Sequence, residues 1–238
     1  MQFKTRKARS LFGQSEPTVL PQGRRQRSLP KWRPQLGTEP QNPWPQAELS
    51  PQGHAPEHNL GNPLKITESE IGDGLGGNIK TIDMMKKVAR IRSGDPLLRK
   101  LALNILQEYG VKSHHFVDEA LAIGDYVKNR VRYVRDPDNI EYLTDPLEML
   151  KHVQDGTAQG DCDDMALFCA TLLLAIGHQP LFRAVRYEQP LGNFNHIYVV
   201  DYDKNPYGQK MRVVLDCIMK DQPIGYEVQQ LNGEEYPV

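Results

Sequence analysis

The hydrophobic pattern of this chain changes its period at Gly177, and this change is the strongest constraint on the fold. Before Gly177, apolar residues recur at the spacing of one helical face; after it, they alternate as in half-buried strands. Helices followed by an antiparallel meander indicate an α+β domain, with one sheet packed against the last helix. The pattern predicts helices near 77–94, 95–110, 113–131, 145–153 and 162–177, then strands near 182–187, 196–202 and 211–217.

Local signals mark where these helices begin and end. Asp95 and Asp145 each precede a proline, the usual pair for an N-cap and a first helical residue. Ser113 is expected to cap the third helix, and Gly177 to end the fifth. The first helix is expected to bury a stripe made of Ile79, Ile82, Met85, Val88 and Ile91.

The start of the chain has a different composition. Residues 1–63 hold ten of the 18 prolines, and residues 1–35 carry nine Lys or Arg against Glu16 alone. A segment with so few periodic apolar residues does not bury enough surface to offset the entropy lost on ordering. We therefore expect an extended or disordered arm over residues 1–70, followed by a folded domain over 75–238.

The arm suggests a partner, because the charge of residues 1–35 is +8 while that of the rest of the chain is −9. One interpretation is a solvated tail. The other is that residues 1–60 dock on an acidic protein surface, with Trp32 and Trp44 as anchors. Nucleic-acid binding is not expected, since the basic residues are sparse and the remaining chain is acidic.

Composition also bears on location. Three cysteines are too few for a disulfide framework, and an odd number leaves one thiol unpaired. The basic N-terminus lacks the apolar run of a secretory signal, and no stretch is apolar and long enough to span a membrane. These features predict an intracellular or virion-associated protein.

Three residues point to specific chemistry. Cys162 opens the fifth helix, His196 starts one predicted strand, and Asp216 ends another. A cysteine at a helix N-terminus, followed by a strand histidine and a strand aspartate, is an arrangement of nucleophile, base and orienting residue. A hairpin turn centred near residue 206 would place His196 opposite Asp216.

The surroundings of Cys162 both favour and oppose its activation. The unpaired N–H groups of a helix N-terminus favour a thiolate and can donate to an oxyanion. The carboxylates of Asp161, Asp163 and Asp164 oppose the thiolate, so a local cation is needed, and a protonated His196 is the candidate. The other two thiols, Cys169 and Cys217, are expected in the core.

These residues resemble a known family. The stretch Gly160-Asp-Cys-Asp-Asp-Met-Ala166, its apolar helix, Ala175-Ile-Gly-His-Gln-Pro180 and the strand after it resemble the transglutaminase-like superfamily, whose fold is papain-like. The segments Val131–Pro137 and Thr144–Leu150 also resemble those leading to the family's cysteine. The resemblance covers about residues 95 to 220. Tyr198 stands where the family commonly has Trp, and small proteins of this kind resemble ones encoded by tailed phages and prophages.

The resemblance implies acyl transfer, or amide or peptide hydrolysis, through a Cys162 thioester. His196 would be the general base and acid, Asp216 would orient it, and the backbone N–H of Cys162 would stabilise the oxyanion. A protein or peptide substrate and no cofactor are expected.

Two alternatives remain. A metal could bind among Cys162, Asp163, Asp164 and His196, although no paired Cys or His spacing supports a structural zinc. The chain could instead be a non-catalytic virion or scaffold component that keeps a transglutaminase-like fold and uses its arm to dock on partner subunits.

Overall fold

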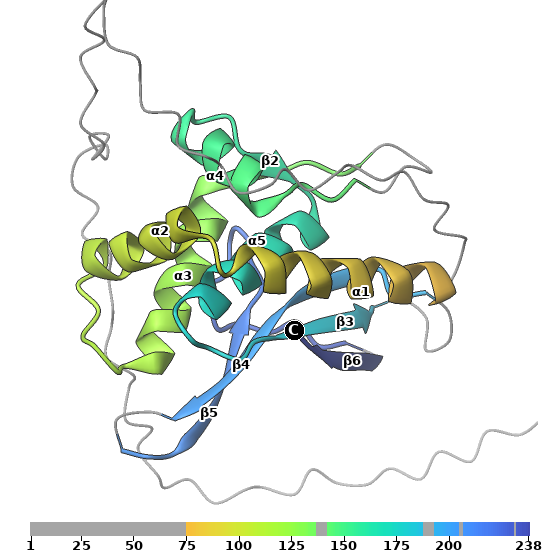
Figure 1. Ribbon diagram of the computed structural model, residues 1–238. Helices are drawn as coiled ribbons and strands as arrows, with labels where there is room; N and C mark the ends of the chain where they lie inside the picture. Colours follow the sequence, from red (N-terminus) through yellow and green to blue (C-terminus); the bar gives the residue numbers. More distant parts are fainter. Residues whose placement is uncertain (1–74, 137–141, 188–192, 205–206, 231) are drawn as a thin grey trace, which may run out of the picture. The chain divides into compact units, whose positions relative to one another are not determined.

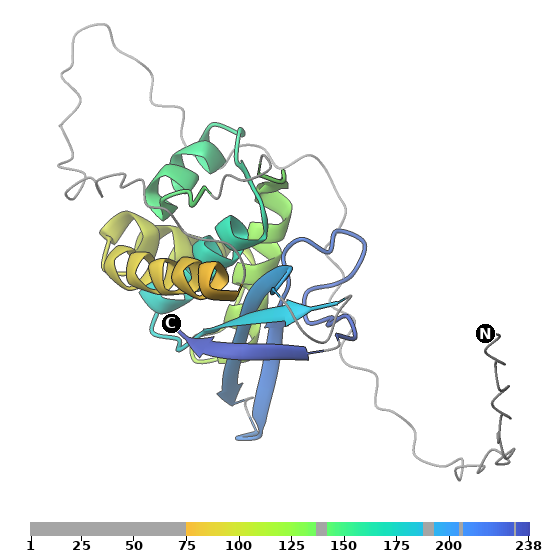
Figure 2. The ribbon, with the colours of Figure 1, turned by 90° about the vertical axis from the view of Figure 1, so that its right-hand side faces the viewer.

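The computed structural model describes residues 75–136, 142–187, 193–204, 207–230 and 232–238, so the expected arm lies outside the described residues. The described fold contains an antiparallel sheet and five helices, which are α1 (Leu75–Arg92), α2 (Pro96–Glu108), α3 (Phe116–Arg130), α4 (Pro146–Gln154) and α5 (Cys162–Ala175). Of these helices, α3 and α5 pack against the sheet while α1, α2 and α4 pack on α5 (Figures 1 and 2). The predicted α+β class is confirmed.

Two of the predicted helix caps form as expected and one does not. The Asp95 carboxylate accepts from the backbone N–H of Leu97, and the Asp145 carboxylate accepts from that of Leu147, both at 2.9 Å. The prediction of Ser113 as a cap is wrong. The N-cap of α3 is His115, which makes no side-chain cap bond, since the chain turns at His114 with φ of 65° before the helix starts.

The buried stripe of α1 is also partly different from the prediction. Ile82 and Met85 are buried, but Ile79 is 39% and Ile91 is 59% exposed. Small or polar-ended residues take the inward positions near them, among them Gly77, Ala89 and Arg92. Arg92 is held there by Asp145, which accepts from its Nε at 2.9 Å. The helix therefore faces the core with a rotated and less apolar surface.

The main sheet has the order β5–β4–β3–β6, with every neighbouring pair antiparallel. Its strands are β3 (Leu181–Arg186), β4 (His196–Lys204), β5 (Lys210–Leu215) and β6 (Asn232–Pro237). The first three were predicted, and β6 was not. A separate parallel pair, β1 (Arg132–Tyr133) and β2 (Gln159–Gly160), was not predicted either and leads directly into α5.

The register of β4 and β5 differs by two residues from the predicted one. Val199 pairs with Leu215 and Lys204 with Lys210. Continued by one residue, this register places Asp216 opposite Tyr198 and diagonal to His196. All three side chains still share a face, because a shift of two residues preserves the side of the sheet.

Helix α5 is the centre of the fold. It packs against α1, α2, α3, α4 and β4, and all of its residues except Cys162 and Leu174 are buried. A helix that is apolar all round is stable only inside a core, where each fully buried large apolar side chain contributes about 1.5–3 kcal/mol. The core therefore fixes α5 firmly, and Cys162 lies at its less buried end.

Candidate active site

Cys162 is held at the start of α5 by local structure on both sides. Tyr133 of β1 pairs with Gly160 of β2, two residues before the thiol. Asp161 is the N-cap of α5, and its carboxylate accepts from the backbone N–H of Asp163 at 3.2 Å. A strand-like entry and a capped first turn thus give Cys162 a defined place, half-buried at the positive end of the helix.

Gly160 is required for this turn. A Cβ atom at residue 160 would lie 2.5 Å from Oδ2 and 2.6 Å from Cβ of Asp164, closer than real atoms pack. Asp164 in turn accepts from the backbone N–H of Thr144 at 2.7 Å. The Gly-Asp-Cys-Asp-Asp motif is therefore a compact unit, in which Asp164 folds back over the backbone that precedes the nucleophile.

The acidic residues around Cys162 are less negative than the sequence suggests. Burial raises the pKa of Asp164 from its ordinary value of 3.8 to about 7, and the nearby Asp161 charge adds to the shift. The hydrogen bond from Thr144 opposes it but does not cancel it. Asp164 therefore holds a proton through much of the range below neutral pH, which removes one of three negative charges beside the thiol.

The structure joins His196 to Asp216. Ring Nε2 of His196 lies 2.9 Å from Oδ2 of Asp216, and both side chains are almost completely buried. Oδ1 of Asp216 accepts from the backbone N–H of Ile218 at 3.3 Å. With Nε2 engaged by Asp216, ring Nδ1 is the nitrogen left for a reaction partner.

Two tyrosines fix the plane of the His196 ring. Tyr187 stacks on it with 5.8 Å between ring centroids, and Tyr198 lies tilted against it at 5.4 Å. Tyr198 is itself anchored, because its hydroxyl donates to Glu227 at 2.5 Å. Tyr198 thus supports the histidine at the position where the family commonly has Trp.

Tyr187 also connects the histidine pair to the thiol. Burial raises the pKa of Tyr187, and the charges of Asp216, Glu227 and Cys162 raise it further. Asp216 and Cys162 therefore both lie within electrostatic reach of one phenol, which stacks on His196. Sequence reasoning missed Tyr187, although it is the last residue of a predicted strand that ends beside the site.

Tyr133 also lies within electrostatic reach of Cys162. Burial raises the pKa of Tyr133, and the next largest effect is the charge of Cys162, followed by that of Asp161. This contact follows from the β1–β2 pairing, which sets Tyr133 beside Gly160. Because the Tyr133 side chain is 42% exposed, the region around the thiol is open to solvent on this side.

The other two cysteines are core residues, as expected. Cys169 and Cys217 are 0% and 3% exposed. The Cys217 thiol donates to the backbone oxygen of Gly124 at 3.5 Å. A hydrogen bond with Cys217, then burial, raises the pKa of the Cys169 thiol well above its usual range. Neither thiol has the exposure or the polar surroundings of a nucleophile.

Of the four residues that the metal alternative names, the structure places Asp163 and Asp164 in one possible metal-binding cluster. Ligand atoms of Asp161, Asp163 and Asp164 lie within 4.8 Å of one another, but Cys162 and His196 do not belong to that group. Such carboxylate clusters suit hard cations. The protonation of Asp164 offers a second way to relieve the repulsion between the three groups.

A basic groove lies beside the strand pair that leads to Cys162. Its volume is about 670 Å³, and Arg132 and Gln159, next to Tyr133 and Gly160, form part of its lining. Arg130 and Lys220 add two more cationic side chains. The Lys220 ammonium also donates to backbone oxygens of Lys128 and Val131, so it is held in place.

Comparisons with known proteins give distant similarities. No protein-family model matches the sequence, and no curated protein matches it. Among solved structures, the chain is similar to a candidate cysteine protease from Cytophaga hutchinsonii, with 18% identity and a TM-score of 0.37 over 58% of this chain and 42% of that one. It is also similar to calcium-bound LapG of Legionella pneumophila, with 17% identity and a TM-score of 0.37 over 66% of this chain and 87% of that one.

The resemblance to the transglutaminase-like superfamily rests on the sequence motifs around Cys162. The chain spans less than half the length of the Cytophaga protein. Similarity at this level does not align individual residues, so the candidate site rests on this chain's own contacts. The association with phages stays a prediction.

Proposed function

We propose that the chain is a cysteine-dependent enzyme that forms a thioester on Cys162 and resolves it with water or an amine. The contact between His196 and Asp216 carries this proposal, since it joins two of the three residues that the sequence singled out. Supporting observations are the position of Cys162 at the start of α5 and the electrostatic coupling of Tyr187 to both Cys162 and Asp216.

The first half-reaction needs one proton shuttle. His196 takes the proton from the Cys162 thiol, and the sulfur forms a bond to the substrate carbonyl carbon while the carbonyl π electrons move to oxygen. When the carbonyl re-forms, the carbon–nitrogen bond breaks and His196 returns the proton to the leaving nitrogen. Asp216 holds the ring through Nε2 and stabilises the imidazolium that forms between these steps.

The second half-reaction reverses the roles. Water or an amine loses a proton to His196 and attacks the thioester carbon, and the sulfur leaves as Cys162 thiol after taking that proton back. The product is an acid in the first case and a new amide in the second. The same three residues serve hydrolysis and transfer, so the competing nucleophile decides between them.

The helix start supplies the candidate oxyanion donor. In the first turn of α5, the backbone N–H of Asp163 donates to Asp161, and that of Asp164 donates to Asp163. These side-chain bonds occupy the second and third amides of the helix. We assign the oxyanion to the backbone N–H of Cys162, which lies at the first position of the helix.

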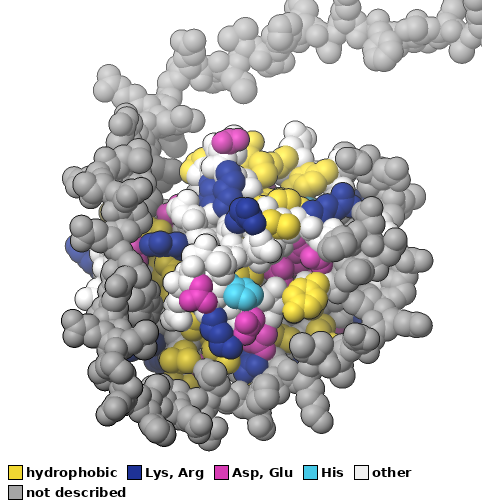
Figure 3. Space-filling view, turned by 90° about the horizontal axis from the view of Figure 1, so that it is seen from above, with side chains coloured by type: hydrophobic (Ala, Val, Ile, Leu, Met, Phe, Trp, Pro, Cys, Tyr) yellow, Lys and Arg dark blue, Asp and Glu magenta, His cyan; other side chains and the backbone are white. Residues whose placement is uncertain are grey.

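The substrate is proposed to be a protein or peptide. The basic groove beside Gln159 offers Arg130, Arg132 and Lys220 to backbone carbonyls or acidic side chains. Over the face shown in Figure 3, the described side chains mix Lys and Arg with Asp and Glu, and no single sign of charge dominates. That mixture fits a peptide better than a nucleic acid, which selects one-signed basic surfaces. Among the described residues, no helix is long and apolar enough to cross a membrane.

The test is turnover with both nucleophiles. The full chain is incubated with a fluorescent peptide mixture, once in water alone and once with a dansyl-labelled primary amine. Peptide cleavage or amine incorporation that disappears in Cys162→Ser supports the proposal, and Cys169→Ser serves as the matched thiol control. Turnover that survives Cys162→Ser contradicts it.

The scaffold alternative makes a different prediction. Residues 1–60 lie outside the described residues, and their charge of opposite sign to the rest of the chain is what favours docking. If the arm docks on a partner, its deletion leaves the melting temperature of the domain unchanged and abolishes assembly. A large loss of stability on deletion would mean that the arm packs on its own domain.

A further inference from the structure

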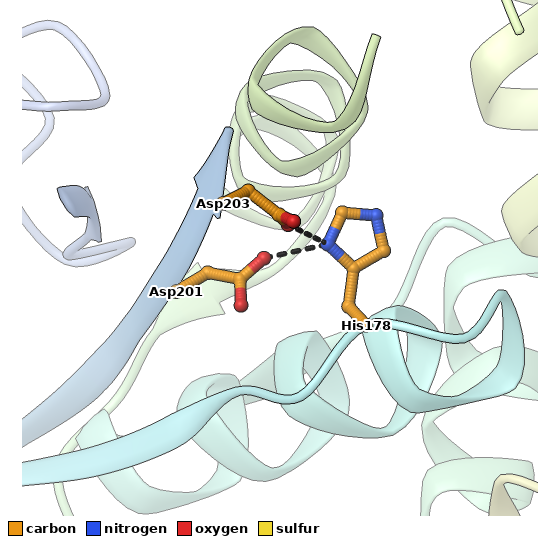
Figure 4. A group of neighbouring side chains, drawn as sticks. All are labelled: His178, Asp201 and Asp203. Carbon is orange, nitrogen blue, oxygen red and sulfur yellow. Dashed lines mark hydrogen bonds and ion pairs between the residues drawn. The ribbon is translucent and has the colours of Figure 1, made fainter. Parts of the chain in front are cut away.

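A buried charged cluster lies at the other end of α5, separate from the proposed active site. His178 follows the C-terminus of the helix, about 20 Å along its axis from Cys162 at 1.5 Å per residue. Figure 4 shows Asp201 and Asp203 of β4 pointing toward the same nitrogen of the His178 ring. Nδ1 lies 2.6 Å from Oδ2 of Asp201 and 3.0 Å from Oδ2 of Asp203.

The opposite ring nitrogen is held by a third carboxylate. Oε2 of Glu119, on α3, lies 3.1 Å from Nε2 of His178. Oε1 of Glu119 accepts from the backbone N–H of His114 at 3.1 Å, so both carboxylate oxygens are engaged. Because a carboxylate only accepts, Nε2 carries the ring proton and donates it to Glu119. Phe116 packs edge-on against the ring at 5.9 Å.

This arrangement directs Nδ1 at two further acceptors. The side chains of His178 and Asp201 are each 1% exposed, so water does little to screen the repulsion between the Asp201 and Asp203 carboxylates that face Nδ1. A cation at Nδ1, either a ring proton or a metal ion, offsets this repulsion.

Neutralising the cluster with protons alone requires several of them. Three carboxylates and one imidazolium still leave two negative charges inside the fold, and uncompensated buried charge costs several kcal/mol. A single divalent ion that replaces the proton at Nδ1 lowers this excess from two negative charges to one. The donor set, one imidazole nitrogen and two carboxylate oxygens within 4.8 Å of one another, suits a first-row transition metal.

We propose that His178 Nδ1, Asp201 and Asp203 form a binding site for a divalent transition-metal ion such as Zn²⁺, with Glu119 as the positioning residue. A carboxylate that accepts from the second nitrogen of a ligating histidine is the usual way in which proteins orient such a ring. Asp203 is 23% exposed and provides the way in for the ion. The ion would tie α3, the end of α5 and β4 together.

The test uses the full chain with Cys162 replaced by Ser, so that the active-site thiol does not bind the probe. After removal of metals with a chelator, ZnCl₂ is titrated by calorimetry, and Co²⁺ is titrated by visible absorption. We expect one equivalent of Zn²⁺ and a melting temperature that rises with ZnCl₂ concentration. The Co²⁺ spectrum should report nitrogen and oxygen ligands.

Variants locate the ion. Asp203→Asn, at a partly exposed position that tolerates the change, should weaken Zn²⁺ binding at least about tenfold, and Glu119→Gln about 10- to 100-fold. Asp118→Asn is the matched control, since Asp118 pairs with His115 at 3.2 Å on the exposed side of α3, and it should bind as the parent does. Absence of Zn²⁺ binding, or binding that Asp203→Asn leaves unchanged, overturns the proposal.

Discussion

The protonation of Asp164 leads to a prediction about stability and pH. Its pKa is raised from 3.8 to about 7 by burial, so the folded chain binds a proton between these values that the unfolded chain has lost. Stability therefore falls as the pH rises from about 4 to about 7, by about 1.4 kcal/mol per pH unit. Over the whole interval the loss is about 4 kcal/mol.

Asp164→Asn removes this titration while keeping an oxygen that accepts from Thr144. Urea unfolding followed by circular dichroism at pH values between about 4 and 8 gives both stability curves. We expect the variant to gain about 4 kcal/mol relative to the parent across that range. Asp221→Asn changes an exposed position, so its curve of unfolding free energy against pH should run parallel to that of the parent. An Asp164→Asn curve that is also parallel would refute the assignment of a buried, protonated Asp164.

Two further substitutions test the geometry of the site. Gly160→Ala should lower the free energy of unfolding by about 1–3 kcal/mol, because the added Cβ would overlap Asp164. Gly76→Ala is the control, since residue 76 has open space around it and the change should be neutral or stabilising. Equal effects of the two variants in thermal melts would contradict the close approach of Gly160 and Asp164. Asp216→Asn should slow the reaction of Cys162 with an electrophile at least about tenfold without a change in melting temperature, because Asn leaves His196 without its carboxylate. An unchanged rate would mean that Asp216 does not act on Cys162 through His196.

Much of the fold follows from local sequence signals. Asp95 and Asp145 cap helices because their side chains reach backbone N–H groups two residues away, a contact that does not depend on the rest of the chain. The apolar run of α5 predicted a buried helix for a similarly local reason. Ser113 failed as a cap because the chain turns at His114, and that turn depends on Glu119 accepting from the His114 N–H.

The strand β6 was not predictable from its own residues. Its sequence, Asn-Gly-Glu-Glu-Tyr-Pro, has no apolar alternation, and its pairing with β3 depends on contacts formed only in the folded chain. Arg183 of β3 lies 3.2 Å from Glu235 of β6. Gly233 is needed where a Cβ would come within 2.9 Å of Val185.

The candidate site was partly visible in the sequence. The order of Cys162, His196 and Asp216 and their shared sheet face came from the strand period, and the contact between His196 and Asp216 is confirmed although the register is shifted. The role of Tyr187 and the His178 cluster depend on tertiary packing. The sequence did contain one signal of that cluster. Asp201 and Asp203 lie two residues apart on a strand, so they share a face that is otherwise apolar, and two carboxylates on such a face indicate a buried polar site.

The reactivity of Cys162 is the most direct test of whether this thiol is an activated nucleophile. Limiting iodoacetamide is added to the full chain, and the alkylation of each cysteine is followed by peptide mass spectrometry. If Cys162 is the nucleophile, it reacts far faster than Cys169 or Cys217, and His196→Ala slows Cys162 while leaving the buried thiols unchanged. Equal alkylation rates at all three thiols, or a Cys162 rate that His196→Ala leaves unchanged, would contradict the role of Cys162 as a nucleophile activated by His196.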